Sequence, residues 1–151
     1  MIAKIVSGGQ TGVDRAALNV AIALGIPCGG WCPRGRLAED GAISRAYPLR
    51  ETPTSDYAER TRWNVRDSDG TLVLTFGMPA GGTAATIGIA KALGKPLHTV
   101  DLAAQANVAE TIEWLRTHHI GTLNVAGPRA STQEQIYLLA ETFLRELLQG
   151  Y

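Results

Sequence analysis

Residues 2–25 read IAKIVSGGQTGVDRAALNVAIALG, and this stretch decides the fold. The run from Ile2 to Val6 is short and mostly apolar, which is typical of a buried strand. Between Val13 and Leu24 the apolar residues recur at intervals of three and four, which predicts a helix that ends before Gly25. A strand that passes through a glycine-rich turn into a helix indicates the first part of a β-α-β arrangement.

The same alternation continues to the end of the sequence. Further strands are predicted near 28–31 and over 71–75, 96–100 and 123–126, with helices at about 57–66 and 82–93, around 108–119, and in the last stretch, where residues 131–134 have a capping-box pattern. Strands separated by helices need crossover connections. The sequence therefore predicts one α/β domain over residues 1–151, with a doubly wound, mainly parallel sheet of about five strands and helices on both faces. The expected strand order is 2-1-3-4-5, with 3-2-1-4-5 as the alternative.

The composition limits which classes of partner the protein can have. Lys plus Arg and Asp plus Glu both total 14, so the formal net charge is zero and no nucleic-acid partner is expected. No apolar stretch approaches the ~18 residues of a membrane span, and residues 1–7 reach glycine too soon for a signal peptide. A cytoplasmic protein with no membrane partner is expected. Cys28 and Cys32 lack the spacing of a zinc site, so no metal ligands are predicted.

Glycines, hydroxyls and arginines gather after the predicted strands, where ligands bind in such sheets. The candidate ligand-binding residues are Gly8, Gly9, Gln10, Thr11, Gly12 and Arg15; Arg34, Gly35, Arg36, Glu39 and Asp40; Gly81, Gly82 and Thr83; and Arg129 and Ser131. Glycine turns let backbone amides approach an anion, helix N-termini attract negative charge, and arginine adds charged hydrogen bonds. These features predict a pocket for a phosphorylated small molecule.

Some charged residues allow more than one interpretation. Glu39 and Asp40 are expected to hold Arg34 and Arg36 in place, to bind ligand N–H groups, or to form a surface cluster. Arg60 and Asn64 share one face of the helix before the third strand, and a solvated helix face explains them nearly as well as a site. No nucleophile elbow, Walker lysine or H-E-x-x-H motif is present, and no histidine lies in a glycine-rich loop. No catalytic residue is therefore predicted.

Several motifs together resemble one known family. GGQTGVDRAAL at 8–18, WCPRGR at 31–36, RTRWNV at 60–65 and NVAGPR at 124–129 are similar to motifs of the molybdenum cofactor carrier protein family. The resemblance implies a Rossmann-like domain that forms oligomers and is related to lysine-decarboxylase-like nucleotide-binding proteins. It implies molybdenum cofactor (molybdopterin) as the ligand, held by the glycine-rich loops.

The related phosphoribohydrolases carry a P-G-G-x-G-T-x-x-E loop with a catalytic Glu. Here the corresponding stretch, 79–86, ends in Thr86, which argues against hydrolysis by the same route. The leading hypothesis is a carrier without catalytic activity. The alternatives are an enzyme acting on a nucleotide or a nucleotide-derived molecule, with an acid/base drawn from Asp14, Glu39, Asp40 and Asp101, or a nucleotide-sensing protein.

A homo-oligomer, either a dimer or a tetramer, is also predicted. The helix over 82–93 is apolar nearly all round, and the last helix has apolar residues outside its main stripe. Apolar faces of this kind need a cover. The alternative is that the loop over 33–53 folds back over one of the two helices.

Overall fold

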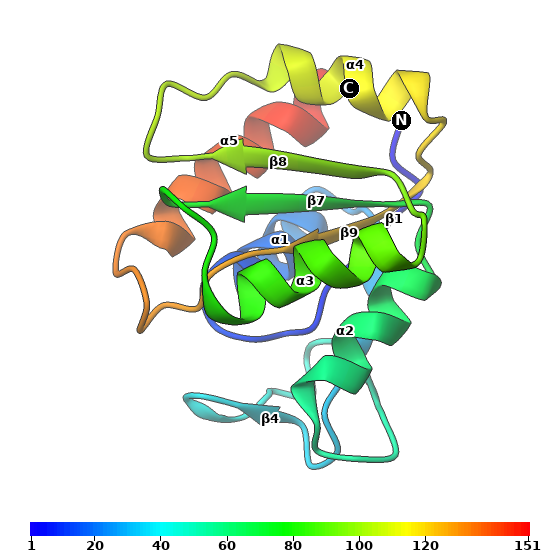
Figure 1. Cartoon of the computed structure of the whole chain (residues 1–151), viewed down its shortest axis with the longest axis vertical. Coiled ribbons are helices and arrows are strands. Elements are labelled where there is room, and N and C mark those ends of the chain that lie inside the picture. The colour runs from blue at the N-terminus through cyan, green and yellow to red at the C-terminus, as the bar shows by residue number, and fades with distance from the viewer.

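Five parallel strands form the central sheet of the computed structural model, which describes residues 1–151. They are β1 (Lys4–Val6), β2 (Cys28–Gly29), β7 (Gly70–Thr75), β8 (Leu97–Asp101) and β9 (Thr122–Ala126). Every neighbouring pair in the sheet is parallel (Figure 1). The predicted α/β class and mainly parallel sheet are confirmed.

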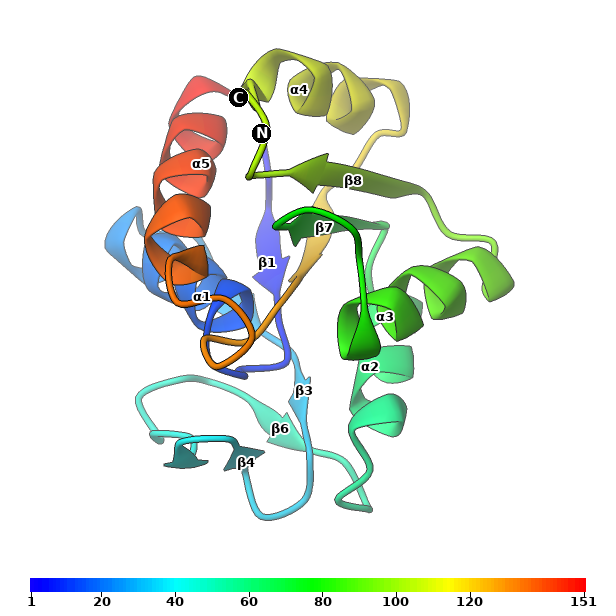
Figure 2. The ribbon, with the colours of Figure 1, turned by 60° about the vertical axis from the view of Figure 1, so that its left-hand side comes forward.

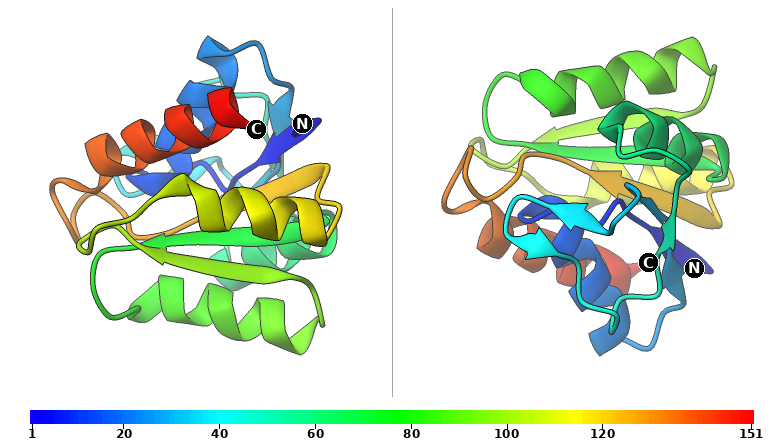
Figure 3. Two further views of the ribbon diagram at one scale, coloured as in Figure 1. Left: turned by 90° about the horizontal axis from the view of Figure 1, so that it is seen from above. Right: turned by 90° about the horizontal axis from the view of Figure 1, so that it is seen from below.

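Helices cover both faces of this sheet. They are α1 (Val13–Ala23), α2 (Tyr57–Arg66), α3 (Gly81–Ala92), α4 (Val108–Thr117) and α5 (Ile136–Gly150). α1 and α4 both pack against α5 on one face, and α2 packs against α3 on the other (Figure 3). None of the helices combines the length and apolar character needed to cross a membrane.

The start of α2 agrees with the residues that precede it, and the start of α5 does not agree with its predicted cap. Asp56 caps α2 by accepting a hydrogen bond from the Ala58 N–H at 2.9 Å. The capping box expected at 131–134 is wrong, because α5 begins only at Ile136 and has no side-chain cap. The hydroxyl of Ser131 donates instead to the carboxylate of Glu39, and Ser131 lies in the loop before the helix.

The strand order differs from both expected orders. It runs β2-β1-β9-β7-β8, so β9 lies between β1 and β7. The chain reaches this slot because the crossover through α4 leads from the edge strand β8 past β7 to the middle of the sheet. Read from β9 onward and then from β1, the strands follow the order 3-2-1-4-5. The sheet is thus a circularly permuted doubly wound sheet, and the two chain ends lie side by side (Figure 2).

The main core lies between this sheet and the helices α1, α4 and α5. All six residues of β7 are buried, as is typical of a central strand in a parallel sheet that is covered on both faces. Leu72 and Leu74 of β7 pack with Leu115 of α4 and with Leu144 and Leu147 of α5, and all five are fully buried. Burying each leucine stabilises the fold by about 1.5–3 kcal/mol. The apolar face of α5 is therefore covered within one chain.

The segment 31–53 is less irregular than expected. β3 (Trp31–Cys32) pairs in parallel with β6 (Arg50–Glu51), and β4 (Leu37–Ala38) pairs with β5 (Gly41–Ala42) in a hairpin. We call this segment the insert. A small apolar cluster joins it to Leu18 of α1. The insert therefore packs beside α1, and α1 and α4 supply the cover of α5 (Figure 2).

Arg36 is the centre of the insert. Its guanidinium donates hydrogen bonds to the carbonyls of Ile43 at 3.0 Å, Ser44 at 2.8 Å, Tyr47 at 2.9 Å and Leu49 at 3.1 Å. Its side chain is buried, and its φ of 55° turns the hairpin. The hydrogen-bonding capacity of Arg36 is thus used within the insert.

Glu39 fastens the insert to two loops at the sheet edge. Its carboxylate accepts hydrogen bonds from the hydroxyls of Thr11 and Ser131 and from the Ser131 N–H at 3.1 Å. Its own N–H donates to the side-chain oxygen of Gln10 at 2.8 Å. The hydrogen bonds from Ser131 and Thr11 hold the pKa of Glu39 below its ordinary value. We call these contacts the Glu39 brace.

Asp40 and Arg15 form a second link beside the brace. Nη1 of Arg15 lies 3.1 Å from the Asp40 carboxylate, and Nη2 of Arg15 donates a hydrogen bond to the carbonyl of Gly9 at 3.0 Å. The expectation that Glu39 and Asp40 hold Arg34 and Arg36 is wrong. Glu39 instead contacts the loops after β1 and β9, and Asp40 contacts Arg15 of α1, because the hairpin β4–β5 folds toward them.

We predict that Arg36→Ala lowers the free energy of unfolding by about 1.5–3 kcal/mol, because it leaves buried carbonyls without a donor. The matched control is Arg34→Ala, two residues away and exposed, which should change it by less than about 0.5 kcal/mol. Urea unfolding followed by circular dichroism measures both. Equal effects of the two substitutions would contradict the structural role of Arg36.

We predict that the Glu39 brace weakens in acid. A carboxyl whose pKa is lowered on folding stabilises the protein above its unfolded pKa, and this contribution is lost as pH falls through the folded pKa. The Tm of the wild type should therefore exceed that of Glu39→Ala near neutral pH, and the difference should shrink as the pH is lowered toward about 3. A Tm difference that stays constant over this range would refute the brace.

Candidate functional site

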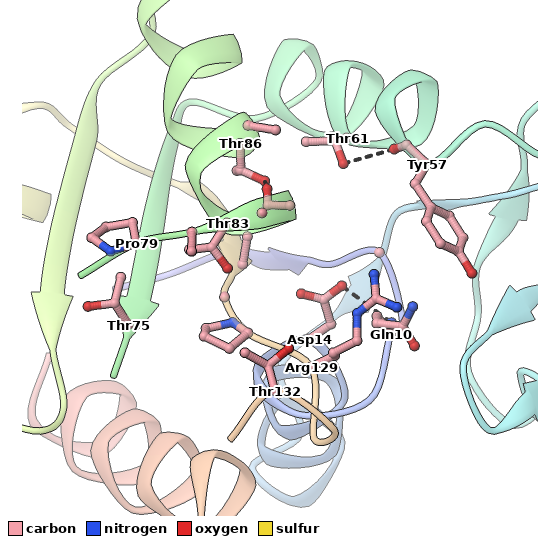
Figure 4. Close-up of a pocket in the computed structure, with 18 of the residues that line it drawn as sticks. Gln10, Asp14, Tyr57, Thr61, Thr75, Pro79, Thr83, Thr86, Arg129 and Thr132 are labelled. Atoms are coloured by element: carbon pink, nitrogen blue, oxygen red, sulfur yellow. Dashed lines mark hydrogen bonds between the residues drawn. The ribbon is translucent and has the colours of Figure 1, made fainter. Parts of the chain in front are cut away.

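A cleft of about 680 Å³ opens at the carboxyl ends of β9 and β7 (Figure 4). In the permuted reading of the sheet this is the switch point, because the helices that follow the two strands, α5 and α3, lie on opposite faces. The walls come from the loop after β1, from α2, from the loop after β7 with the start of α3, and from the loop after β9. Parts of the chain that are distant in sequence thus meet here.

The cleft brings together part of the predicted site. Its lining includes Gly8, Gln10, Gly81, Gly82, Thr83, Arg129 and Ser131. The other candidates lie outside the lining: Gly9, Thr11, Gly12, Arg15, Arg34, Gly35, Arg36, Glu39 and Asp40. Arg34 and Gly35 border a separate shallow hollow at the far end of the insert. The Glu39 brace and the link beside it account for Thr11, Arg15, Glu39 and Asp40.

Gly9 and Gly12 are needed for close packing. A Cβ at Gly9, whose φ is 78°, would lie 2.5 Å from Leu49 of the insert. A Cβ at Gly12, whose φ is 80°, would lie 2.3 Å from the carbonyl oxygen of Pro128. The expectation that these two glycines give an anion access to the backbone is therefore wrong, because protein atoms fill the space beside them.

The N-terminus of α3 is the part of the cleft where backbone is bare. Ala80 precedes the helix and offers no side-chain cap, and the first turn has no acidic residue. A Cβ at Gly81 or Gly82 would meet no atom within 4 Å. The first N–H groups of a helix have no acceptor within the helix and carry the positive end of its dipole. This end of α3 can therefore bind an anion.

Two arginines in the lining differ in how they are paired. Arg60 of α2 donates to the carbonyl of Gly8 at 2.9 Å and lies 3.5 Å from Asp14. The side chain of Arg129 forms no ion pair and no hydrogen bond within the chain, and its guanidinium lies over the ring of Tyr57, 5.9 Å from the centroid. Arg129 is thus the cation of the cleft that is free for a ligand.

Asp14 is the single acidic residue of the lining and is almost wholly buried. Its Oδ2 accepts a hydrogen bond from the Gln10 N–H at 3.3 Å. Burial raises the pKa of this carboxyl, and the nearby Arg60 guanidinium opposes that rise. The cleft therefore holds a buried carboxyl with Arg60 and Arg129 near it, and the start of α3 forms another part of its wall.

Gln10 lies in the lining near Asp14, and its side chain is buried (Figure 4). Its Oε1 accepts hydrogen bonds from the N–H groups of Thr11 at 3.1 Å and Glu39 at 2.8 Å. Its Nε2 is buried and has no partner in the protein. Such a group is uncommon in folded proteins and calls for an explanation.

The sequence left open whether α2 contributes to the site. Arg60 and Asn64 share the face of α2 that borders the cleft, and their four-residue spacing was the available signal. Asn64 itself holds the backbone of Trp31 through hydrogen bonds of 2.7 and 2.9 Å.

Thr86, at the position of the phosphoribohydrolase Glu, also lines the cleft and donates to the carbonyl of Gly82 at 3.0 Å. No group of three or more His, Cys, Asp or Glu residues is placed to hold a metal ion.

Comparison with known proteins agrees with this architecture. A family model described as the circularly permutated YpsA SLOG family matches residues 5–148. Among solved structures, the chain is similar to the crystal structure of a "Putative molybdenum carrier protein" from Syntrophus aciditrophicus SB, with 47% sequence identity and a TM-score of 0.93. The match covers 97% of this chain and 95% of the other. No curated protein matches the sequence. The resemblance to molybdenum cofactor carriers is confirmed, and the chain belongs to the circularly permutated YpsA SLOG family.

Proposed function

We propose that this protein is a carrier that binds a phosphorylated small molecule in the cleft, and that the molecule is molybdenum cofactor. One observation carries the proposal: the unpaired guanidinium of Arg129 and the bare N-terminus of α3 border the same cleft. Both bind phosphate oxygens well, the helix through its amides and the arginine through charged hydrogen bonds. The name of the structural relative supports molybdenum cofactor as the cargo.

The size and polarity of the cleft fit such a ligand. Its volume of about 680 Å³ lies within the ~300–1,000 Å³ range of small-molecule sites. In this proposal the phosphate binds at the start of α3, where Gly81 and Gly82 lie, and Arg129 supplies a charged hydrogen bond to it. The rest of the ligand then extends inward, toward Gln10 and Asp14.

An enzyme acting on a nucleotide-derived molecule is the second candidate, and the placement of Asp14 favours it. A buried carboxyl with a raised pKa in a cleft has the properties of a general acid or base. Glu39, Asp40 and Asp101 are exposed and lie outside the lining, and hydrogen bonds lower the pKa of each. Within this alternative Asp14 is therefore the residue to test.

The two candidates make different predictions for a mixture of the protein with nucleoside monophosphates. An enzyme releases base or phosphate, which chromatography of the products detects. A carrier leaves its ligand intact and gains stability on binding, which appears as a raised Tm. If product forms, Asp14→Asn should abolish it while the Tm shift persists. Product formation would overturn the carrier proposal.

We predict that Gly82→Asp abolishes binding of molybdenum cofactor without harming the fold. The new side chain has room, and an acid in the first turn of α3 stabilises the helix by about 0.3–1 kcal/mol. It also repels a phosphate at the same place. Ala109→Asp in the first turn of α4, exposed and outside the lining, adds the same charge and serves as the control. Titration with cofactor released from a molybdenum enzyme measures both.

We predict that Arg129→Ala weakens the same binding by roughly ten- to a hundredfold, which corresponds to about 1.5–3 kcal/mol for a charged hydrogen bond. Arg34→Ala is the control, because Arg34 is equally charged and lies outside the cleft. The two variants are compared by calorimetry. Wild-type affinity in Arg129→Ala would place the phosphate elsewhere.

We also propose that the protein forms a homo-oligomer through α3. Its residues Ala84 and Gly88 are exposed, and so are Leu93, which follows the helix, and Met78, which precedes it. Ala84→Arg should therefore shift the mass measured by light scattering toward that of a monomer. Leu138→Arg, at an exposed apolar position on α5, should leave the mass unchanged. A monomeric wild type at micromolar concentration would contradict this proposal.

A further inference from the structure

We propose that Glu39 positions the guanidinium of Arg129 in the cleft, so that the insert sets the affinity of a site to which it contributes no wall. The inference rests on the proposed function, because it takes Arg129 as a residue that binds the phosphate. No residue of the insert lines the cleft. Its influence therefore passes through the loop after β9, which carries Arg129 and which the Glu39 brace contacts.

The side chain of Arg129 has no polar contact that fixes its position. It forms no ion pair and no hydrogen bond within the chain, and its guanidinium lies over the ring of Tyr57. Figure 4 shows it beside Asp14 and Gln10. A long side chain without polar partners keeps much of its rotamer freedom. The place of the guanidinium in the cleft therefore depends on the backbone around Arg129.

Two hydrogen bonds hold the backbone that follows Arg129. The N–H of Ala130 donates to the hydroxyl oxygen of Thr11 at 3.1 Å, and the N–H of Ser131 donates to the carboxylate of Glu39 at 3.1 Å. The acceptors come from the loop after β1 and from the insert, so the loop after β9 does not form these contacts by itself. Its backbone is fixed from outside.

Glu39 governs both of these hydrogen bonds. A hydroxyl has one proton to donate and two lone pairs that accept. Thr11 donates its proton to the carboxylate of Glu39, so its lone pairs are left for the Ala130 N–H. The hydroxyl of Ser131 also donates to this carboxylate. Glu39 is therefore a positioning residue, which acts on the ligand site through the backbone next to Arg129.

The brace lies where it can be reached without entering the ligand site. Glu39 is exposed, whereas Arg129 is half-buried in the lining of the cleft. A group that binds Glu39 from outside would release the backbone next to Arg129 and lower the affinity of the cleft. For a carrier, the control of release is then separate from the pocket that holds the cargo.

The charge of Glu39 gives the test a decisive sign. Hydrogen bonds from Ser131 and Thr11, and to a smaller extent the charge of Arg129, lower the pKa of Glu39, so it is an anion near neutral pH. An anion close to the cleft opposes the binding of a phosphate. If Glu39 acted through its charge, its removal would strengthen binding. Because it positions Arg129, its removal should weaken binding instead.

Glu39→Ala is the test variant, and Asp40→Ala is its matched control. Asp40 is the next residue of the same hairpin and carries the same charge, but it holds the insert through Arg15 and does not contact the loop after β9. Glu39→Gln is the conservative variant, because its amide oxygen can still accept from the Thr11 hydroxyl and the Ser131 N–H. Circular dichroism melts show whether each variant folds.

The probes are adenosine monophosphate and molybdenum cofactor released from a molybdenum enzyme, each titrated by calorimetry at neutral pH. Glu39→Ala should weaken the binding of whichever probe the wild type binds by about three- to tenfold, as expected for the loss of one hydrogen bond. Asp40→Ala and Glu39→Gln should stay within about twofold of the wild type. When Arg129 is already alanine, Glu39→Ala should weaken binding by less than about twofold further, because both residues act through one contact.

Each of four results overturns the inference while the carrier function stands. Glu39→Ala binds as tightly as the wild type or more tightly, or Asp40→Ala loses as much affinity and shows that any anchor of the insert is equivalent. Glu39→Gln binds as weakly as Glu39→Ala, or the effects of Glu39→Ala and Arg129→Ala add in full. If the wild type binds neither probe, the proposed function itself fails.

Discussion

The pairing of β9 with two strands from distant parts of the sequence is the constraint on which the rest of the structure depends. Residues Lys4–Val6 of β1 align with one side of β9, and Gly70–Val73 of β7 align with the other. Without β9 the pairs β2–β1 and β7–β8 share no hydrogen bonds. Where the chain leaves β9, a Cβ at Gly127 would lie 2.3 Å from the carbonyl oxygen of Leu74. This tight passage directs the next loop, with Arg129, into the cleft.

Much of the fold could be predicted from the sequence, because the evidence for each element is local. The period of the apolar residues identifies α1 and the buried strand β7, and Asp56 marks the start of α2. The strand order could not be predicted in this way. An amphipathic crossover helix reveals which of its faces is buried, but its sequence does not state which slot of the sheet the next strand fills. β9 has the same apolar character that it would need in a slot nearer the edge.

The site was predictable to the extent that its residues follow strands. Gly82 and Arg129 could be predicted as site residues for that reason. Arg36 also follows a strand, but it is not part of the cleft. An arginine in a glycine-rich loop has the same local sequence whether its guanidinium faces a ligand or, as here, the carbonyls of its own insert. Arg60 is the opposite case. It reaches the cleft because Gly8 has no side chain, since a Cβ there would lie 2.0 Å from its Nη1.

The late position of β9 in the sequence affects how the protein is made. Until residues 122–126 have left the ribosome, β1 and β7 each present an unpaired strand edge, and such edges are prone to pair with other chains. The cleft also has no floor at this stage, because the loop after β9 has yet to be synthesised. A nascent chain can therefore hold no cargo, and any cellular factor that protects it during synthesis must act on exposed β-edges before the central strand arrives.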